Sequence, residues 1–111
     1  MELDRGDICL VNFNPTKGHE MGKLRPAIIL SEAQDNEILD TLIVIPLSTV
    51  IEPNTMPYRF HVTSRDKLQE NSDACIYGIR ALSKIRIKEK LGFLNQNEIK
   101  TVQECLCKIV G

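Results

Sequence analysis

The chain has 111 residues, of which 42% are hydrophobic and 26% charged, and its formal net charge is −1. This length predicts that residues 1–111 form one domain with a modest core. The balanced charge argues against a general nucleic-acid coat, which carries a large positive excess. The N-terminus lacks the pattern of a signal peptide, and the longest apolar run is too short to cross a bilayer. We therefore expect a cytoplasmic protein with no membrane partner.

Short apolar runs, separated by turn residues at fairly even intervals, predict a mainly β fold of antiparallel strands in a small barrel. The runs cover residues 7–13, 27–30, 41–47, 58–63, 74–82 and 90–94. Residues 16–24 are polar and are expected to form an exposed loop, and the acidic stretch 32–40 is expected to be a second turn or loop. Pro46 predicts that the third strand stops or bulges there. Gly78 predicts a bulge in the fifth strand.

The C-terminal residues follow a different pattern. Apolar residues recur there with helical spacing, at Ile99, Val102, Leu106, Ile109 and Val110. Asn95 precedes this pattern, and Glu98 three residues later completes a variant of the capping box. These features predict one amphipathic helix over residues 96–109, packed on the sheet or on a second subunit.

The remaining composition indicates no cofactor and no metal. None of the four cysteines forms a C-x-x-C pair, so we expect buried free thiols and not a zinc site. A basic stretch is open to two interpretations, a solvated surface or a local phosphate-binding face. It comprises Arg80, Lys84, Arg86, Lys88 and Lys90.

The polar loop and the residue after it hold the densest set of chemically useful side chains. Around Gly18 and Gly22 stand Lys17, His19, Glu20, Lys23 and Arg25. A histidine can move protons near neutral pH. An arginine can hold a phosphate through two hydrogen bonds and stabilise charge in a transition state. On these residues alone, Arg25 could equally pair with a carboxylate such as Asp7.

Two further positions carry alternatives. Ser48 and Thr49 follow Pro46 at a strand end, where their hydroxyls either orient a phosphate or ribose or belong to ordinary turn chemistry. His61 lies on the polar face of its strand, where it is a solvated or cross-strand histidine or an RNA contact. Asp73 is too distant in sequence from other acids to indicate a carboxylate pair.

Arg5-Gly6-Asp7 spells a cell-adhesion tripeptide, which we interpret as a chance match in a chain with no secretion signal. Taken in order, however, the motifs of the chain resemble the MazF/PemK family of toxin ribonucleases. The matching stretches are Arg5-Gly6-Asp7-Ile8, residues 13–20, Arg25-Pro26-Ala27, Pro46-Leu47-Ser48-Thr49, Ile79-Arg80-Ala81-Leu82 and Leu91-Gly92. They cover nearly the whole chain, and the set is specific in a way that no single piece is.

The resemblance implies an SH3-like antiparallel β-barrel with a C-terminal helix, assembled as a two-fold homodimer. It implies a sequence-selective, metal-independent endoribonuclease that cleaves single-stranded RNA, including messenger RNA. In that reaction a 2′-hydroxyl attacks the adjacent phosphate. A small antitoxin with an acidic, partly disordered tail is expected to neutralise the toxin.

By resemblance, Arg25 is the catalytic arginine, Ser48 replaces a catalytic threonine, and His19 matches the histidine of the Kid branch. The RNA-binding residues expected are Lys17, Glu20, Lys23, Thr49, His61 and Arg80. The chain departs from the family at Tyr77-Gly78, where an acid and a glutamine are usual, and at Cys75, where Kid has an arginine. The base of the Kid branch is therefore missing, and either His19 takes more of the proton transfer or the Arg25–Ser48 pair suffices.

Two other functions remain alternatives at this point. One is a gyrase poison like CcdB, which shares the fold but ends in Trp-Gly-Ile, whereas this chain has no Trp. The other is a non-catalytic RNA-binding member of the fold, which the departure at Tyr77 keeps open.

Overall fold

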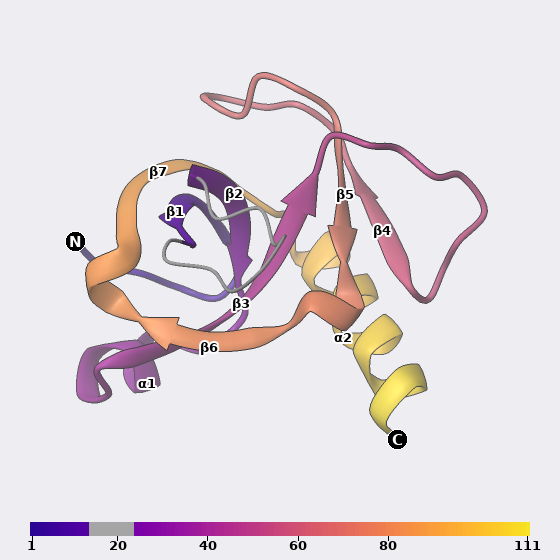
Figure 1. The fold of residues 1–111 in the computed structure, drawn as a ribbon. Coiled ribbons are helices and arrows are strands. Elements are labelled where there is room, and N and C mark those ends of the chain that lie inside the picture. Colours follow the sequence, from indigo (N-terminus) through magenta and orange to yellow (C-terminus); the bar gives the residue numbers. More distant parts are fainter. Residues whose placement is uncertain (14–23) are drawn as a thin grey trace.

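The computed structural model describes residues 1–13 and 24–111 (Figure 1). The polar-loop residues Lys17, His19, Glu20 and Lys23 lie outside the described residues. In the described part, the elements in order are β1 (Asp7–Asn12), β2 (Leu24–Ile29), α1 (Ala33–Ile38), β3 (Thr41–Ser48), β4 (Arg59–Val62), β5 (Ser72–Cys75), the 3₁₀ helix η1 (Ile76–Gly78), β6 (Arg80–Ser83), the 3₁₀ helix η2 (Lys84–Arg86), β7 (Ile87–Phe93) and α2 (Gln96–Val110).

The strands pair antiparallel in the order β4-β5-β3-β2-β1-β7, and β6 pairs with β3 outside this path. The first part of β3 pairs with β6, its centre with β2, and its last two residues with β5. A mainly antiparallel β fold with a C-terminal helix is therefore confirmed. The pairings between described strands form an open path, so the sheet curls around its core without closing into a barrel (Figure 1).

Strands β1, β2 and β3 are buried on both faces, because alternate side chains enter two separate cores. One core packs against α2 and contains Ile8, Ile28, Ile45, Leu47, Val62, Ala74, Ile99, Val102 and Cys105, among others. The second core lies on the opposite face and includes Cys9, Val11, Ala27, Ile29, Leu42, Val44 and Leu82. The sheet thus has one face toward α2 and one face turned away from it.

Helix α2 confirms the prediction from helical spacing, and it ends one residue later than expected. The Glu98 N–H donates to Asn95 Oδ1 at 2.8 Å, and the Asn95 N–H donates to Glu98 Oε1 at 2.9 Å. This is the predicted capping box, which satisfies two otherwise unpaired donors of the first turn. No helix in the described part of the chain is long and apolar enough to cross a membrane.

Three local predictions were wrong. The acidic stretch contains helix α1, which is anchored by buried Asn36 through bonds from Nδ2 to the carbonyl oxygens of Leu3 at 3.0 Å and Ser31 at 2.9 Å. Strand β3 continues through Pro46 to Ser48, since its pairing passes from β2 to β5 there. Residues 74–82 form two strands separated by η1, and Gly78 is part of this turn.

Candidate active site

A row of polar side chains crosses the sheet where β3 ends. Ser48 pairs with Asp73 of β5, and Asp73 pairs with His61 of β4. Directly opposite residues of antiparallel strands point to the same face. Their apolar neighbours Leu47, Ala74 and Val62 enter the core against α2. The three polar residues therefore lie on the face turned away from the helix.

Arg25 continues this row on the other side of β3. Strand β2 pairs Arg25 with Val11 of β1 and Ala27 with Pro46 of β3. Val11 and Ala27 enter the core turned away from α2, so Arg25 lies on the same face as Ser48. Both side chains are half-buried. We call Arg25, Ser48, Asp73 and His61 the polar row. It brings together residues from four strands on one face of the sheet.

Asp73 is the buried centre of this arrangement, with 2% of its surface exposed. Its Oδ2 accepts hydrogen bonds from the backbone N–H of Glu52 at 2.8 Å and from Arg59 Nη1 at 3.4 Å, and its Oδ1 lies 3.1 Å from His61 Nδ1. Burial alone raises the pKa of a carboxyl, but these contacts with Glu52, His61 and Arg59 hold the pKa of Asp73 below its ordinary value. Asp73 is therefore ionised at neutral pH.

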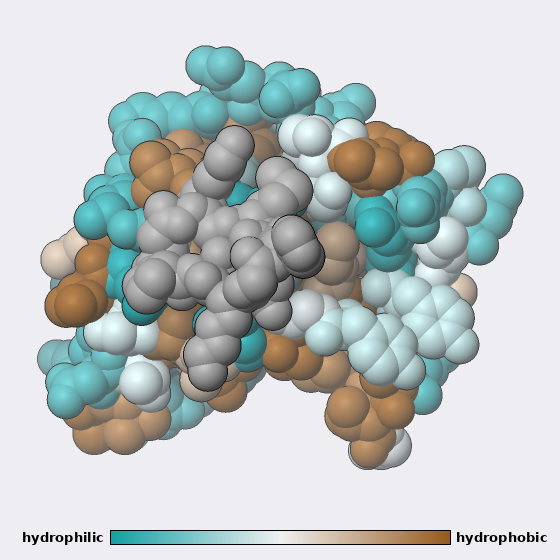
Figure 2. Space-filling view, viewed as in Figure 1, coloured by the Kyte–Doolittle hydropathy of each residue, from teal (hydrophilic) through white to brown (hydrophobic). Residues whose placement is uncertain are grey.

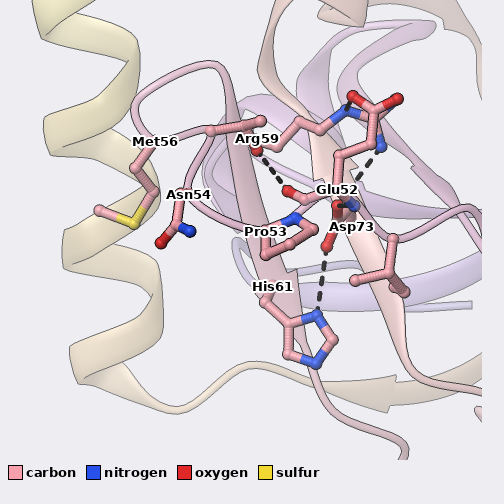
Figure 3. A pocket seen from close by; sticks show the side chains of 9 residues that line it. Glu52, Pro53, Asn54, Met56, Arg59, His61 and Asp73 are labelled. Carbon is pink, nitrogen blue, oxygen red and sulfur yellow. Dashed lines mark hydrogen bonds and ion pairs between the residues drawn. The ribbon is translucent and has the colours of Figure 1, made fainter.

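The charge of Asp73 determines how His61 is protonated. An ionised carboxylate is only an acceptor, so Nδ1 of a neutral His61 ring carries the hydrogen of this bond. Nε2 then holds a lone pair, and 47% of the side chain is exposed to solvent. Figure 3 shows the ring with Nδ1 turned to Asp73 and Nε2 turned away from it. His61 can thus accept a proton at Nε2, on a side chain that is half exposed.

A pocket of about 490 Å³ opens beside this pair, between strand β4 and the loop that follows β3 (Figure 3). It is lined by Ile51, Glu52, Pro53, Asn54, Thr55, Met56, Arg59, His61 and Asp73. Arg59 joins its two sides, because its guanidinium lies 3.4 Å from Glu52 Oε2 and 3.4 Å from Asp73 Oδ2 and donates to the carbonyl oxygen of Val50 at 2.9 Å. The loop is therefore fixed to the polar row.

Ser48 is oriented locally as well. Its Oγ accepts a hydrogen bond from the backbone N–H of Val50 at 3.2 Å, as expected for a serine at a strand end. The hydroxyl still has its own hydrogen to donate. Among the described residues, no three His, Cys, Asp or Glu side chains lie close enough together to hold a metal ion.

Comparison with known proteins places this arrangement in a family. Residues 4–110 match the model of the PemK-like, MazF-like toxins of type II toxin–antitoxin systems. The chain belongs to this toxin family. It is 32% identical over 105 residues to a protein of Staphylococcus saprophyticus named endoribonuclease MazF, covering 94% of this chain and 88% of that protein. A Staphylococcus epidermidis protein of the same name is also 32% identical over 105 residues.

Solved structures of MazF toxins have the same fold. MazF from Deinococcus radiodurans has a TM-score of 0.80 and 26% identity, covering 100% of this chain and 98% of that one. A chain of a MazE–MazF crystal structure from the same organism has a TM-score of 0.78 at 18% identity and covers 100% and 97%. The latter likeness concerns the fold alone.

The other predicted RNA-binding residues of this toxin lie in different settings. Thr49 is exposed immediately beside the row. Arg80 pairs with Val44, four residues along β3 from Ser48, and its guanidinium lies 5.7 Å from the centre of the Phe13 ring. Within the basic stretch, Lys90 Nζ lies 3.3 Å from Asp7 Oδ2, and Arg86 donates to the carbonyl oxygen of Asn12 at 3.2 Å. Lys90 and Arg86 thus already have partners within the protein.

Tyr77, at the position where the sequence departs from the family pattern, stacks on Tyr58 with ring centres 5.8 Å apart and planes 20° apart. The two residues are 70% and 55% exposed. Figure 2 shows a mixed surface on one face of the toxin, where separate apolar patches lie among hydrophilic residues. Tyr77 thus contributes an exposed aromatic side chain, and not a carboxylate, to this surface.

Sequence reasoning missed Asp73, Arg59 and Glu52 as parts of the site. The alternation of residues 58–63 predicts the polar face on which His61 lies, and the structure confirms it, because Phe60 and Val62 pack on the core from the opposite face. The partner of His61 is 12 residues away in sequence. It becomes visible only once the register of β4 and β5 is known.

Proposed function

We propose that this protein is a sequence-selective, metal-independent endoribonuclease toxin, with Arg25 and Ser48 as catalytic residues. Membership of the toxin family and relatives named endoribonuclease MazF support this activity. The observation that carries the assignment of residues is the alternation along β2 and β3, which puts Arg25 and Ser48 on the face of the sheet turned away from α2. Two groups that suit a phosphodiester thus share one face of the sheet.

In the proposed reaction, the 2′-hydroxyl of one nucleotide attacks the adjacent phosphorus, and the bond to the 5′ oxygen of the next nucleotide breaks. The products are a cyclic phosphate and a 5′-hydroxyl end. Arg25 donates two hydrogen bonds to the phosphate oxygens and stabilises the negative charge that builds up on them. The Ser48 hydroxyl donates to the same phosphate and fixes its orientation. In-line attack requires a splayed nucleotide, so the substrate is single-stranded RNA.

The remaining partners follow from the same proposal. Because the proposed substrate is messenger RNA, we expect the toxin to act in the cytoplasm. A small antitoxin with an acidic tail, of the kind named MazE in the Deinococcus complexes, neutralises it. The positions expected for RNA contacts in the polar loop are Lys17, Glu20 and Lys23, and His19 of the same loop is expected to take part in cleavage. We further propose that the toxin works as a homodimer of single-domain chains, which sedimentation equilibrium tests directly.

Purified protein incubated with a long RNA in EDTA tests the activity. The expected result is repeated cutting at one short sequence, with 5′-hydroxyl ends found by end mapping. RNA binding without any cutting contradicts the proposal and favours a non-catalytic member of the fold. Inhibition of gyrase without cutting favours the gyrase poison instead.

Arg25→Ala tests the assignment of the catalytic arginine. Removing one charge-stabilising donor is expected to lower the cleavage rate by about 100-fold or more. Ser48→Ala is expected to lose activity and Ser48→Thr to retain it, because threonine keeps the hydroxyl. Single-turnover cleavage measures the rate, and unchanged thermal unfolding shows that each variant is folded. A wild-type rate in Arg25→Ala refutes the assignment.

A further inference from the structure

We propose that His61, held by Asp73, accepts the proton of the attacking 2′-hydroxyl. This inference rests on the proposed ribonuclease function. The attack needs a group that accepts the proton of the 2′-hydroxyl, and Arg25 and Ser48 are assigned to the phosphate instead. In the described part of the polar row, His61 and Asp73 are the remaining members.

The position of His61 suits this task. Neighbouring strands lie about 5 Å apart, so Ser48 and His61, two strands apart, have backbones separated by about 10 Å. Both side chains lie on the face turned away from α2, and the carboxyl of Asp73 fills the position between them. A nucleotide whose phosphate contacts Arg25 and Ser48 reaches Nε2 only if its ribose passes over Asp73 to the outer edge of the His61 ring.

The chemistry of the pair matches general base catalysis. The Asp73 carboxylate accepts from Nδ1–H of His61, which fixes the tautomer and leaves the Nε2 lone pair for an incoming proton. Once Nε2 is protonated, the buried negative charge beside it stabilises the imidazolium, as the aspartate of a catalytic triad does. Asp73 is the positioning residue, and His61 is the group that touches the substrate.

A purely structural role explains less of the geometry. Asp73 fastens the loop after β3 through the Glu52 N–H and Arg59, and these two contacts need no histidine. His61 is half exposed and presents the Nε2 edge of its ring beside the pocket (Figure 3). A histidine that served only to satisfy a buried carboxylate would gain nothing from this open edge.

In the proposed step, the proton of the 2′-hydroxyl passes to Nε2 of His61 while the 2′ oxygen forms a bond to phosphorus. The bond between phosphorus and the 5′ oxygen breaks, and that oxygen takes a proton from water. The imidazolium of His61 then releases its proton to solvent. No metal, oxidant or other co-reactant takes part. The charged groups around His61 in the described structure are Asp73 on β5, Arg59 on β4 and Glu52 in the adjoining loop.

The pH dependence of cleavage tests the proposal, because the chain has only two histidines, His19 and His61. Wild type is expected to lose activity in acid as the base becomes protonated. His61→Gln is expected to lower kcat by about 100-fold or more and to abolish this acid limb, a loss typical of a general base. His19→Gln is expected to keep the limb. Lys100→Ala, an exposed substitution on α2, is the control for surface changes.

Rescue with added imidazole separates catalysis from structure. His61→Ala opens a space at a half-exposed position, so free imidazole is expected to restore part of kcat without changing KM. Asp73→Asn is expected to lower kcat, since the imidazolium loses its carboxylate partner. Asp73 is buried, so its replacement can unfold the protein. In that case the two His61 variants are the decisive measurements.

The outcomes are distinct. Loss of the acid limb in His61→Gln together with imidazole rescue of His61→Ala supports the proposal. A limb that persists in His61→Gln and disappears in His19→Gln overturns it and assigns the proton transfer to His19. A kcat within about threefold of wild type in His61→Gln also overturns it, given the size expected for a general base. Failure of the ribonuclease function itself is recognised separately, because wild type would then cut no RNA.

Discussion

Gly6→Ala is expected to destabilise the protein strongly, because the Arg5-Gly6-Asp7 tripeptide forms a constrained turn. Gly6 has a φ of +96°, its N–H donates to the Ile29 carbonyl at 2.7 Å, and its carbonyl accepts from Leu94 N–H at 2.8 Å. A Cβ at this position would lie 2.5 Å from Ile99 Cδ1. The substitution therefore meets an unfavourable backbone conformation and a filled core at once.

The two effects set the magnitude. A non-glycine residue in a sparsely populated positive-φ conformation costs about 1–3 kcal/mol. Forcing a methyl group into a packed core costs about 1–3 kcal/mol. Together the two effects cost about 2–6 kcal/mol. A typical domain is stable by about 5–15 kcal/mol, so this loss is a large part of its stability. Urea unfolding at one fixed protein concentration measures it, and a midpoint lower by about 1 M or more is expected for typical slopes.

Gly92→Ala is the matched control. A Cβ at Gly92 would lie 3.3 Å from Arg65 Cγ, which belongs to a long side chain, and the φ of Gly92 is not in the left-handed region. Its cost is expected to stay below about 1 kcal/mol. Adding Ile99→Val to Gly6→Ala removes the atom of closest contact, Ile99 Cδ1. The double variant is expected to recover only the part of the lost free energy of unfolding that comes from packing. Equal midpoints for Gly6→Ala and Gly92→Ala would refute the reasoning.

Glu98→Gln is expected to lower the free energy of unfolding by about 1.5–3 kcal/mol at pH 7, since two charge-assisted bonds to Arg65 are weakened. These bonds to Arg65 hold the pKa of Glu98 below its ordinary 4.5, so the stabilisation is complete above about pH 4.5 and is lost as the pH falls through the lower folded pKa. Urea unfolding midpoints of the variant and of wild type at pH 7 and pH 3 measure this loss of stabilisation. If the two proteins differ by the same amount at both pH values, the prediction is contradicted. Burial raises the pKa of Cys9 to about 12 and raises that of Cys105, whereas Cys107 is exposed. In native protein a thiol reagent should therefore modify Cys107 rapidly and the two buried thiols only on unfolding, and rapid modification of Cys9 would disprove the burial.

The fold was predictable where the information is local. Helix α2 carries its own start signal in Asn95 and Glu98 and its own apolar spacing, so its position needs no knowledge of the sheet. Helix α1 does not, because its six residues are held by Asn36, whose amide bonds to Leu3, distant in the chain. The turn at Gly78 is similar, since a Cβ there would lie 2.7 Å from Pro46 Cγ, on another strand. Both depend on tertiary contacts that a sequence pattern does not contain.

The candidate site divides in the same way. The motifs around Arg25 and Ser48 predict these two residues from the sequence, although their alignment on one face follows only from the register of β2 and β3. His61 was predicted on a polar strand face, with RNA contact as one alternative. The chemistry now proposed for it depends on Asp73, which the sequence leaves isolated from other acids. The pairing of His61 on β4 with Asp73 on β5 brings these two residues together.

The pairing of β4 with β5 also places a second basic side chain next to His61. Cys75 and Asp73 are two residues apart on β5, so both side chains lie on the side turned away from α2. Arg59 lies directly across from Cys75 and His61 directly across from Asp73. A guanidinium and an imidazole therefore lie on the same face of β4. Because Arg59 is bound to Glu52, Asp73 and the Val50 carbonyl, it stabilises the carboxylate. His61 has one ring nitrogen bound to Asp73 and is half exposed, so of these two side chains it is the one proposed to accept a proton.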